Sequence, residues 1–237
     1  MNLNTVFRGP ATVDPPYLTV DTEPAAELLT HSDAVVSSHL RRDNSADDTY
    51  VDLVLKAARR HFERLTGLAL INTKFKVTFD SSPIRMGQYG IEYGLAPSMS
   101  RFTGLAAGRE IKLGRAPLVT VDEFKYLDQN GALQTFDPSN YTVGSVGVAY
   151  TFGRLWLNDG ADWPDFGSFP GALQLKFTAG YHASDPTKVP EEIRMAVLWL
   201  AAHWYEQHLP TGDADTIDQL PFHLFSMIDH FRVAHTA

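Results

Sequence analysis

The sequence contains no cysteine among its 237 residues. Disulfide bonds, thiolate nucleophiles and cysteine-ligated zinc are therefore excluded. Long apolar runs are also lacking, because the longest, around residues 193–202, is far shorter than the roughly 20 residues that span a bilayer. The N-terminus shows no basic start followed by an apolar stretch, so it does not read as a signal peptide. We expect a soluble protein without a membrane partner.

Positive charge is scarce: 20 Lys and Arg face 28 Asp and Glu, which gives a formal net charge of −8. Tight static binding of nucleic acid depends mostly on Lys and Arg against phosphates, so an acidic chain argues against it. The same charge does not exclude DNA that passes by without being held. A chain of this length with 44% hydrophobic residues can form one large domain, or one domain with a sizeable insertion.

The common catalytic motifs are missing. Gly-x-Ser-x-Gly is absent, since residues 144–147 resemble it only at the wrong spacing. No phosphate-binding loop or dinucleotide fingerprint occurs. The acid pairs Asp47–Asp48 and Asp213–Asp215 lie in polar segments, where carboxylates are solvated and poorly suited to paired acid–base catalysis. We predict no catalytic residue and no cofactor.

One stretch, HWYEQH, suggests a metal site because it holds His203, Glu206 and His208. Zincins place two histidines four residues apart on one helical face. Here the spacing is five, which turns the two rings by roughly 140° around a helix. His203 and Glu206 can share an ion only with a third ligand from elsewhere. We predict no metal site, with His203 partly buried and His208 at the negative end of a helix; a metal-dependent hydrolase is the alternative.

Residues 1–32 are expected to form an extended arm with a short strand at residues 17–20, since Pro, Thr and Gly are frequent up to about residue 21. Thr30 and Ser32 are candidate N-caps for a helix over residues 33–42.

The clearest helix covers residues 47–66. Its apolar residues recur three and four positions apart: Val51, Val54, Leu55, Ala58, Phe62 and Leu65. Gly67 is placed to end it in the left-handed conformation. Arg59 and Arg60 fall largely off the apolar stripe, and we expect them on a solvated face or in salt bridges between subunits.

A β unit is expected over residues 70–180. Alternating apolar and polar residues, or turn signals between apolar runs, predict strands at residues 75–79, 110–113, 118–127, 133–136, 140–143 and 173–177. Residues 128–131 end in Asn-Gly, which favours a tight hairpin turn. The long loop at residues 85–108 lacks a core of its own, and loops of that length in a compact domain are uncommon.

Helices return after the β unit. Pro190 followed by two glutamates starts a helix over residues 190–208, and Pro210 and Gly212 end it. A polar linker then leads to an amphipathic helix near residues 220–233. The fold class is therefore α+β, with a connector core at residues 33–209 in which an antiparallel β unit is inserted into a helical frame, and a C-terminal linker and helix at residues 210–237.

Several segments resemble, in order, the head–tail connector proteins of long-tailed bacteriophages. They are SSHLRRD; LVLKAARRHFERLTGLALI; IKLGRAPLVTVDEFKYLDQNGALQTF; GRLWL followed by WP; LQLKFTAGY; and VPEEIRMAVLWLAAHWYE. The resemblance covers about residues 34–233. The N-terminal arm and the 85–108 loop have no counterpart in the family pattern.

The resemblance implies a non-enzymatic ring, typically of twelve subunits, in the neck between head and tail. Such a ring docks under the portal, carries the stopper or tail, and lines a channel through which double-stranded DNA passes. A gene transfer agent or a prophage would use the same kind of part. It would act in the virion and assemble in the host cytoplasm. The alternatives are the hydrolase and another tail or capsid structural protein.

Two sets of contact residues follow from this interpretation. The portal interface is predicted on the C-terminal helix, at Phe222, Leu224, Phe225, Ile228, Phe231 and Arg232; simple packing of this helix on its own domain is the alternative. Contacts between subunits are predicted at Tyr89, Tyr93, Met99, Phe102, Trp163 and Phe166. For the last two, which the sequence groups with Trp156 and Phe169, the alternatives are an interior position in the β unit and a ligand-binding surface.

Overall fold

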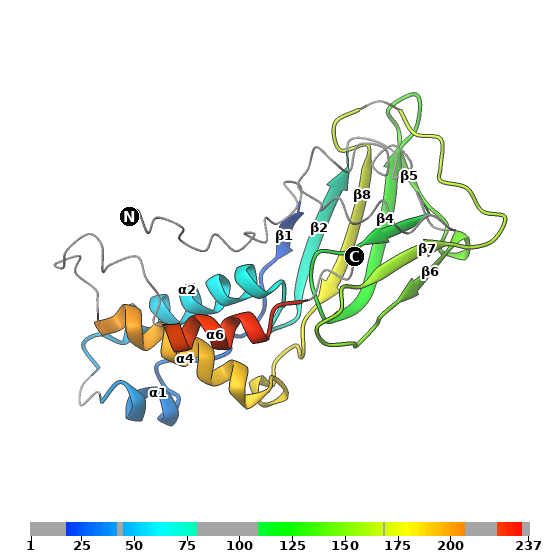
Figure 1. Cartoon of the computed structure of the whole chain (residues 1–237). Coiled ribbons are helices and arrows are strands. Elements are labelled where there is room, and N and C mark those ends of the chain that lie inside the picture. The colour runs from blue at the N-terminus through cyan, green and yellow to red at the C-terminus, as the bar shows by residue number, and fades with distance from the viewer. Residues whose placement is uncertain (1–17, 42–44, 80–108, 168, 207–221, 234–237) are drawn as a thin grey trace, which may run out of the picture.

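The computed structural model describes residues 18–41, 45–79, 109–167, 169–206 and 222–233, with side chains of residues 222–225 excepted. Within these ranges the helices gather into one body and the strands into two antiparallel sheets beside it (Figure 1). Each body has its own hydrophobic core. The predicted α+β class is confirmed.

Within the described residues, four helices form the helical body: α1 (Ala34–His39), α2 (Asp48–Thr66), α4 (Glu191–Glu206) and α6 (Phe222–His230). The helices α2, α4 and α6 pack against one another. The predicted apolar stripe of α2 faces this core, and Gly67 ends the helix with φ at +78°, a left-handed conformation that glycine adopts without a steric penalty. Both predicted features of α2 are confirmed.

The start of α1 differs from the prediction. Asp33, not Thr30 or Ser32, occupies the N-cap position, and its side chain caps no helical N–H. The Asp33 carboxylate instead accepts hydrogen bonds from the backbone N–H and hydroxyl of Thr30, at 2.7 and 3.2 Å. The Thr30 and Ser32 hydroxyls bond to each other at 2.9 Å. These side chains therefore build the turn before the helix, and the predicted caps are wrong.

The first sheet has the order β1-β2-β8-β4-β5 and the second the order β3-β7-β6. The strands of the first are β1 (Leu18–Thr22), β2 (Thr73–Phe79), β8 (Leu173–Ala179), β4 (Leu118–Leu127) and β5 (Leu133–Thr135). Those of the second are β3 (Glu110–Lys112), β7 (Arg154–Leu157) and β6 (Tyr141–Gly144). The strand β7 was not expected from the sequence pattern. Its Leu155 and Leu157 enter the core between the sheets, while the residues beside them stay half-buried.

The described part of the predicted arm packs on the fold. The edge strand β1 pairs with β2, with Leu18 opposite Val77. Further along, Leu28 and Leu29 are buried in the helical core. The chain therefore joins the folded body well before residue 32.

One buried extended segment connects α2 to β2 and contributes to both cores. Because side chains alternate along an extended backbone, Leu68 and Leu70 enter the helical core whereas Ala69 between them enters the sheet core. The Ala69 N–H donates to the carbonyl of Ala116 at 2.7 Å, and the Asn72 N–H donates to the carbonyl of His182 at 3.0 Å. This segment fixes the helical body against the sheets. In the described ranges, no helix is long and apolar enough to cross a membrane.

Candidate assembly surfaces

The structure brings no metal site together around HWYEQH. In the ranges that it describes, no three His, Cys, Asp or Glu side chains lie close enough to hold an ion. His203 and Glu206 lie in the last turns of α4, with His203 half-buried, and His208 lies outside the described residues. The described part of this stretch therefore offers at most two ligands.

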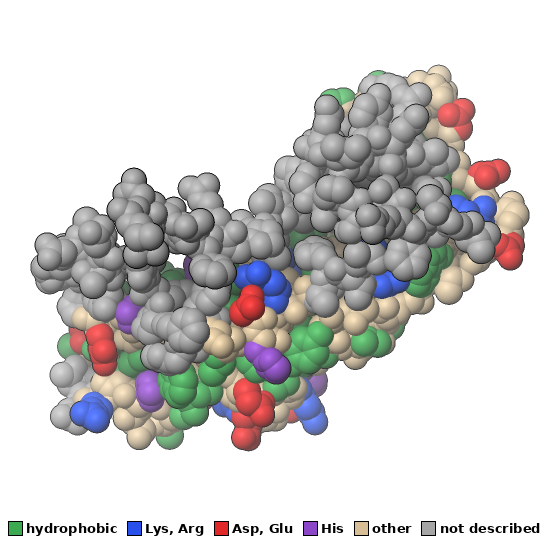
Figure 2. Space-filling model, viewed as in Figure 1, with side chains coloured by type: hydrophobic (Ala, Val, Ile, Leu, Met, Phe, Trp, Pro, Cys, Tyr) green, Lys and Arg blue, Asp and Glu red, His purple; other side chains and the backbone are tan. Residues whose placement is uncertain are grey.

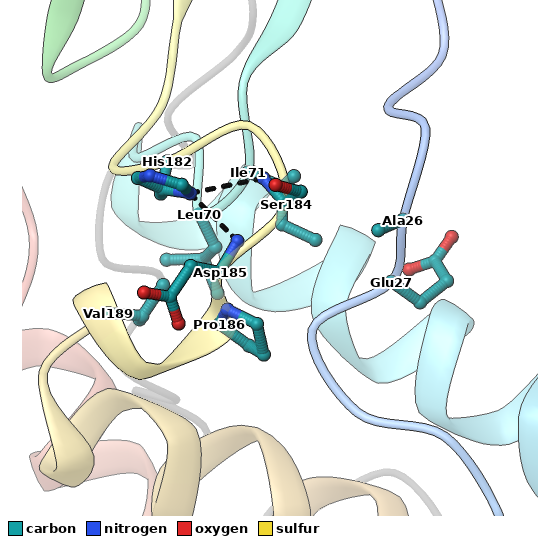
Figure 3. Close-up of a pocket in the computed structure, with 9 residues that line it drawn as sticks. All are labelled: Ala26, Glu27, Leu70, Ile71, His182, Ser184, Asp185, Pro186 and Val189. Carbon is teal, nitrogen blue, oxygen red and sulfur yellow. Dashed lines mark hydrogen bonds between the residues drawn. The ribbon is translucent and has the colours of Figure 1, made fainter.

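A small pocket lies where the helical body meets the turn after β8 (Figure 3). The ring nitrogen Nδ1 of His182 accepts hydrogen bonds from the backbone N–H groups of Ser184 and Asp185, at 3.1 and 2.7 Å. The enclosed space is about 10 Å³, room for a single water molecule at most. His182 therefore holds a turn in place, and the pocket is too small for a substrate.

A larger open groove of about 470 Å³ lies along β4 and β6, lined in part by Val121, Phe124 and Tyr141. Its size suits a small ligand, and two acids, Asp122 and Glu123, line it. Asp122 accepts a hydrogen bond from Thr178 at 2.7 Å. The hydrogen bond from Lys125 lowers the pKa of Glu123, which keeps this carboxylate ionised.

A buried ion network ties several segments of the helical body together. Arg59, expected on a solvated face or in a salt bridge between subunits, is only 2% exposed. Its Nε and Nη1 lie 2.7 Å from carboxylate oxygens of Glu27 and Glu63 respectively. The second oxygen of Glu63 accepts the backbone N–H of Leu70 at 2.8 Å. The predicted solvated position of Arg59 is wrong, because its guanidinium turns inward to these two acids.

The electrostatics of the network follow from burial. Burial raises the pKa of the Glu63 carboxyl above its ordinary value, and Arg59, the Leu70 N–H and Arg115 oppose part of this rise. Burial alone would lower the pKa of Arg59, but Glu63 and Glu27 raise it above its ordinary value. The guanidinium is therefore charged at neutral pH. We assign this network a structural role, since Arg59 has both of its carboxylate partners within the chain.

Exposed apolar side chains mark two helical faces. On α2, Leu53 is 63% exposed on the side opposite the core. On α4, Met195 and Trp199, four residues apart, are 41% and 37% exposed. Figure 2 shows apolar side chains exposed among charged ones on the visible face of the molecule, without a large patch of one charge. Neither face was predicted from the sequence, although Leu53 lies outside the apolar stripe of its helix.

A third exposed apolar group lies on the turn after β6, at Val146, Val148 and Tyr150. Ser145 and Tyr150 have φ near +60°, an uncommon conformation for residues other than glycine. The turn is anchored by the N–H of Gly147, which donates to the carbonyl of Leu118 at 2.7 Å. The Tyr150 ring stacks on that of Phe231, with centroids 6.3 Å apart, so this turn lies against the helical body.

The predicted portal residues lie on or just after α6. Ile228 and Phe231 are buried in the chain's own helical core, where the Phe231 ring packs 6.3 Å from that of Phe62. Arg232 is half-buried and pairs with Asp229 at 3.3 Å. The side chains of Phe222, Leu224 and Phe225 lie outside the described residues. Ile228 and Phe231 therefore pack on their own domain, as the alternative to a portal contact expects.

Four of the residues predicted between subunits, Tyr89, Tyr93, Met99 and Phe102, lie outside the described residues. Trp163 is buried in the sheet core, with its ring 6.1 Å from Phe124 and 6.2 Å from Phe136. Phe166 is partly buried against the same core. Of the possibilities that the sequence left open for this pair, the interior position describes them in the single chain.

Comparison with family models and with curated protein sequences gives no match. Solved structures do match. A chain in the virion of a native gene transfer agent particle is 22% identical, with a TM-score of 0.65 over 93% of this chain and 97% of that one. A chain in the neck of an empty particle, computed with C6 symmetry, is 21% identical with a TM-score of 0.67 over the same shares.

A chain in the neck of a native gene transfer agent particle, computed with C12 symmetry, is 20% identical, with a TM-score of 0.56 over 91% of this chain and 97% of that one. The likeness in all three cases extends over almost the full length of both chains. The chain therefore has the fold of these gene transfer agent chains.

Proposed function

We propose that this chain is a structural protein of the virion neck, of the head–tail connector type of long-tailed bacteriophages and gene transfer agents. It forms a homo-oligomeric ring, twelve-fold, that docks under the portal of the DNA-filled head and carries the stopper or the tail. The supporting observation is the fold shared over 93% of the chain with a chain in the neck of a gene transfer agent particle.

The chemistry of the chain supports a structural role. The described residues contain no three-ligand metal cluster, and the pocket beside His182 is too small for a substrate. The net charge of −8 weakens attraction to phosphates, which suits a channel through which DNA moves without being held. The protein assembles in the host cytoplasm and works by geometry rather than by turnover.

The portal contact is proposed on the solvent side of the C-terminal helix. Because Ile228 and Phe231 hold α6 on the helical core, deleting everything after Pro210 would damage that core together with any portal contact. The exposed residues of α6, which include Ser226 and Asp229, are therefore the positions at which docking can be tested without removing the helix.

Imaging tests the proposed function directly. Negative-stain images of portal rings are compared with and without the full-length protein. The proposal expects an added ring at one end of the portal, with rotational symmetry in top views. Portal rings that look the same after incubation with excess protein would overturn it.

The hydrolase alternative predicts a bound metal. Elemental analysis of the purified protein would then give about one zinc or manganese per chain, lost in His203→Ala. The structural role predicts no stoichiometric metal in either protein. Another tail or capsid role predicts incorporation into particles without a ring at the portal, which the same images distinguish.

A further inference from the structure

The outer face of α2 carries a straight stripe of exposed residues. Leu53, Ala57 and Arg60 are exposed at positions i, i+4 and i+7, a spacing that keeps side chains on one side of a helix. The stripe begins with an apolar side chain and ends with a basic one. Over seven residues its length is about 10 Å.

The outer face of α4 carries a second stripe with the opposite order. Glu192, Met195 and Trp199 are exposed at positions i, i+3 and i+7, so it begins with an acid and ends with an apolar ring, again over about 10 Å. Trp204, which meets His61 of α2 with ring centroids 5.3 Å apart, lies five residues beyond Trp199 and is therefore turned by roughly 140°. The α4 stripe thus points away from α2.

The two stripes complement each other when the helices of two chains run antiparallel. Leu53 then lies opposite Trp199, the small Ala57 opposite the long Met195, and Arg60 opposite Glu192. An apolar contact closed by an opposite-charge pair is the pattern of a specific interface. Since the stripes lie on different helices of one body (Figure 1), each chain offers both halves of a head-to-tail contact, which is the kind that generates rings.

We propose that the α2 stripe of one subunit docks on the α4 stripe of a second copy of this chain, and that this contact joins neighbours in the ring. The inference rests on the proposed function and names the surfaces that the ring uses. Arg60 already pairs with Glu23 at 2.6 Å, but that pair is exposed, with half of the Arg60 side chain in solvent. A guanidinium has five N–H donors, so it can hold the neighbour's carboxylate as well.

A single exposed leucine is ordinary on a protein surface. The inference instead depends on the matched length, the matched polarity and the opposite charges of the two stripes. A charge swap therefore tests it. Arg60→Glu and Glu192→Arg each place like charges at the contact, and the double variant restores opposite charges.

The experiment measures ring formation by native mass spectrometry of the full-length protein, with portal rings and without them. Each single variant is expected to need about tenfold more protein to form the ring, and the double variant to recover most of the loss. The matched controls Lys74→Glu and Asp159→Arg, exposed on β2 and in the turn after β7, make the same charge changes away from both stripes. They are expected to leave assembly unchanged.

A disulfide trap gives a second readout. The chain has no cysteine, so in Ala57→Cys/Met195→Cys the only possible disulfides join the two introduced positions or copies of one of them. Oxidation is expected to give a ladder of covalent multimers on a nonreducing gel. Either single-cysteine variant is expected to stop at dimers, because one thiol per chain cannot propagate a ladder.

The outcomes separate this inference from the proposed function. If rings form and the charge variants assemble like the wild type, or the double-cysteine variant gives no ladder, the inference is overturned while the neck role stands. If the controls weaken assembly as much as the charge swaps, it is overturned as well. If the wild type forms no ring with or without portal, both proposals fail.

Discussion

The guanidinium of Arg59 lies 2.7 Å from the carboxylate of Glu27, and this contact ties the segment before the first helix to the middle of α2. The same guanidinium holds Glu63, which accepts the N–H of Leu70. Leu70 belongs to the extended segment that contributes to both cores. One buried cation thus connects the N-terminal segment, α2 and the joint to the sheets.

Replacing Arg59 with methionine is expected to lower the free energy of unfolding by about 3–5 kcal/mol, because it leaves buried carboxylates without their cation. Denaturant unfolding followed by circular dichroism measures the change. The control is Arg60→Met, measured at a concentration where the protein is monomeric: in the single chain it removes only an exposed ion pair and should cost about 1 kcal/mol or less. Equal costs for the two variants would show that the network does not hold the helical body.

The pH dependence of the Arg59→Met variant follows from Glu63. Burial already raises the pKa of this carboxyl, and removing Arg59 removes an opposing cause. A carboxyl whose pKa is higher in the folded state binds more protons when folded, so its contribution to stability falls as pH rises above the unfolded value of about 4.3. The free energy of unfolding of the variant should therefore be closest to that of the wild type near pH 4, and the difference between them should grow toward neutral pH.

Unfolding free energies measured across that pH range test this sign. The matched comparison removes the titrating carboxyl from both proteins: relative to Glu63→Gln, the double variant Arg59→Met/Glu63→Gln should show a loss of stability that changes much less with pH. A single-variant deficit that shrinks as pH rises would contradict the assigned cause.

The regular parts of this fold could be predicted from local patterns. The spacing of apolar residues gave α2 almost to the residue, and alternation together with turn signals gave most strands, because each pattern reflects one buried face. The strand between β6 and β8 could not be predicted from the sequence. Turns on both sides interrupt the alternation of apolar and polar residues, and β7 is only four residues long. The sequence also predicted one β unit, whereas its strands divide into two sheets with a core between them.

Burial of charge and the choice between core and interface could not be predicted. Arg59 falls beside the apolar stripe, and only the positions of Glu27 and Glu63 in space turn it inward. Trp163 lies in a Gly-, Asp- and Pro-rich stretch that looks like surface, yet long-range contacts with Phe124 and Phe136 bury it. The exposed stripes of α2 and α4 could not be predicted either, because the packing of the two helices decides which of their faces remain in solvent.

The left-handed residue Gly67 allows a matched test of a helix end. Gly67 and Gly160 have φ of +78° and +79°, but a Cβ added at Gly67 would lie 3.1 Å from the Phe152 ring, whereas one at Gly160 would meet nothing within 4 Å. Both alanine variants should lose about 1–2 kcal/mol of stability to the backbone conformation. Gly67→Ala should lose more stability than Gly160→Ala, because its new methyl group must also displace the Phe152 ring. Equal losses would mean that Phe152 moves freely.

The interior position of Trp163 predicts a stability effect independent of assembly. Trp163→Ala should cost the single chain about 3–5 kcal/mol because it opens a cavity beside Phe124 and Phe136. Thermal unfolding at a concentration where the protein is monomeric measures this. The comparison is Trp199→Ala, whose side chain is 37% exposed and which should cost clearly less. A Trp163 variant as stable as the wild type, but unable to form rings, would restore the interface reading.

Docking through the solvent side of α6 can be separated from folding at Ser226, which is exposed on that helix. Ser226→Arg should leave the free energy of unfolding within about 0.5 kcal/mol of the wild type and weaken portal binding, because a long charged side chain then stands in the contact. Ser38→Arg, at an exposed position of α1, is the matched control and should bind portal normally. Ile228→Ala should instead lose about 2–5 kcal/mol of stability, since Ile228 is buried in the helical core. Pull-down on immobilised portal rings measures the binding; if the Ser226 variant is retained as well as the control, the portal contacts another surface of this chain.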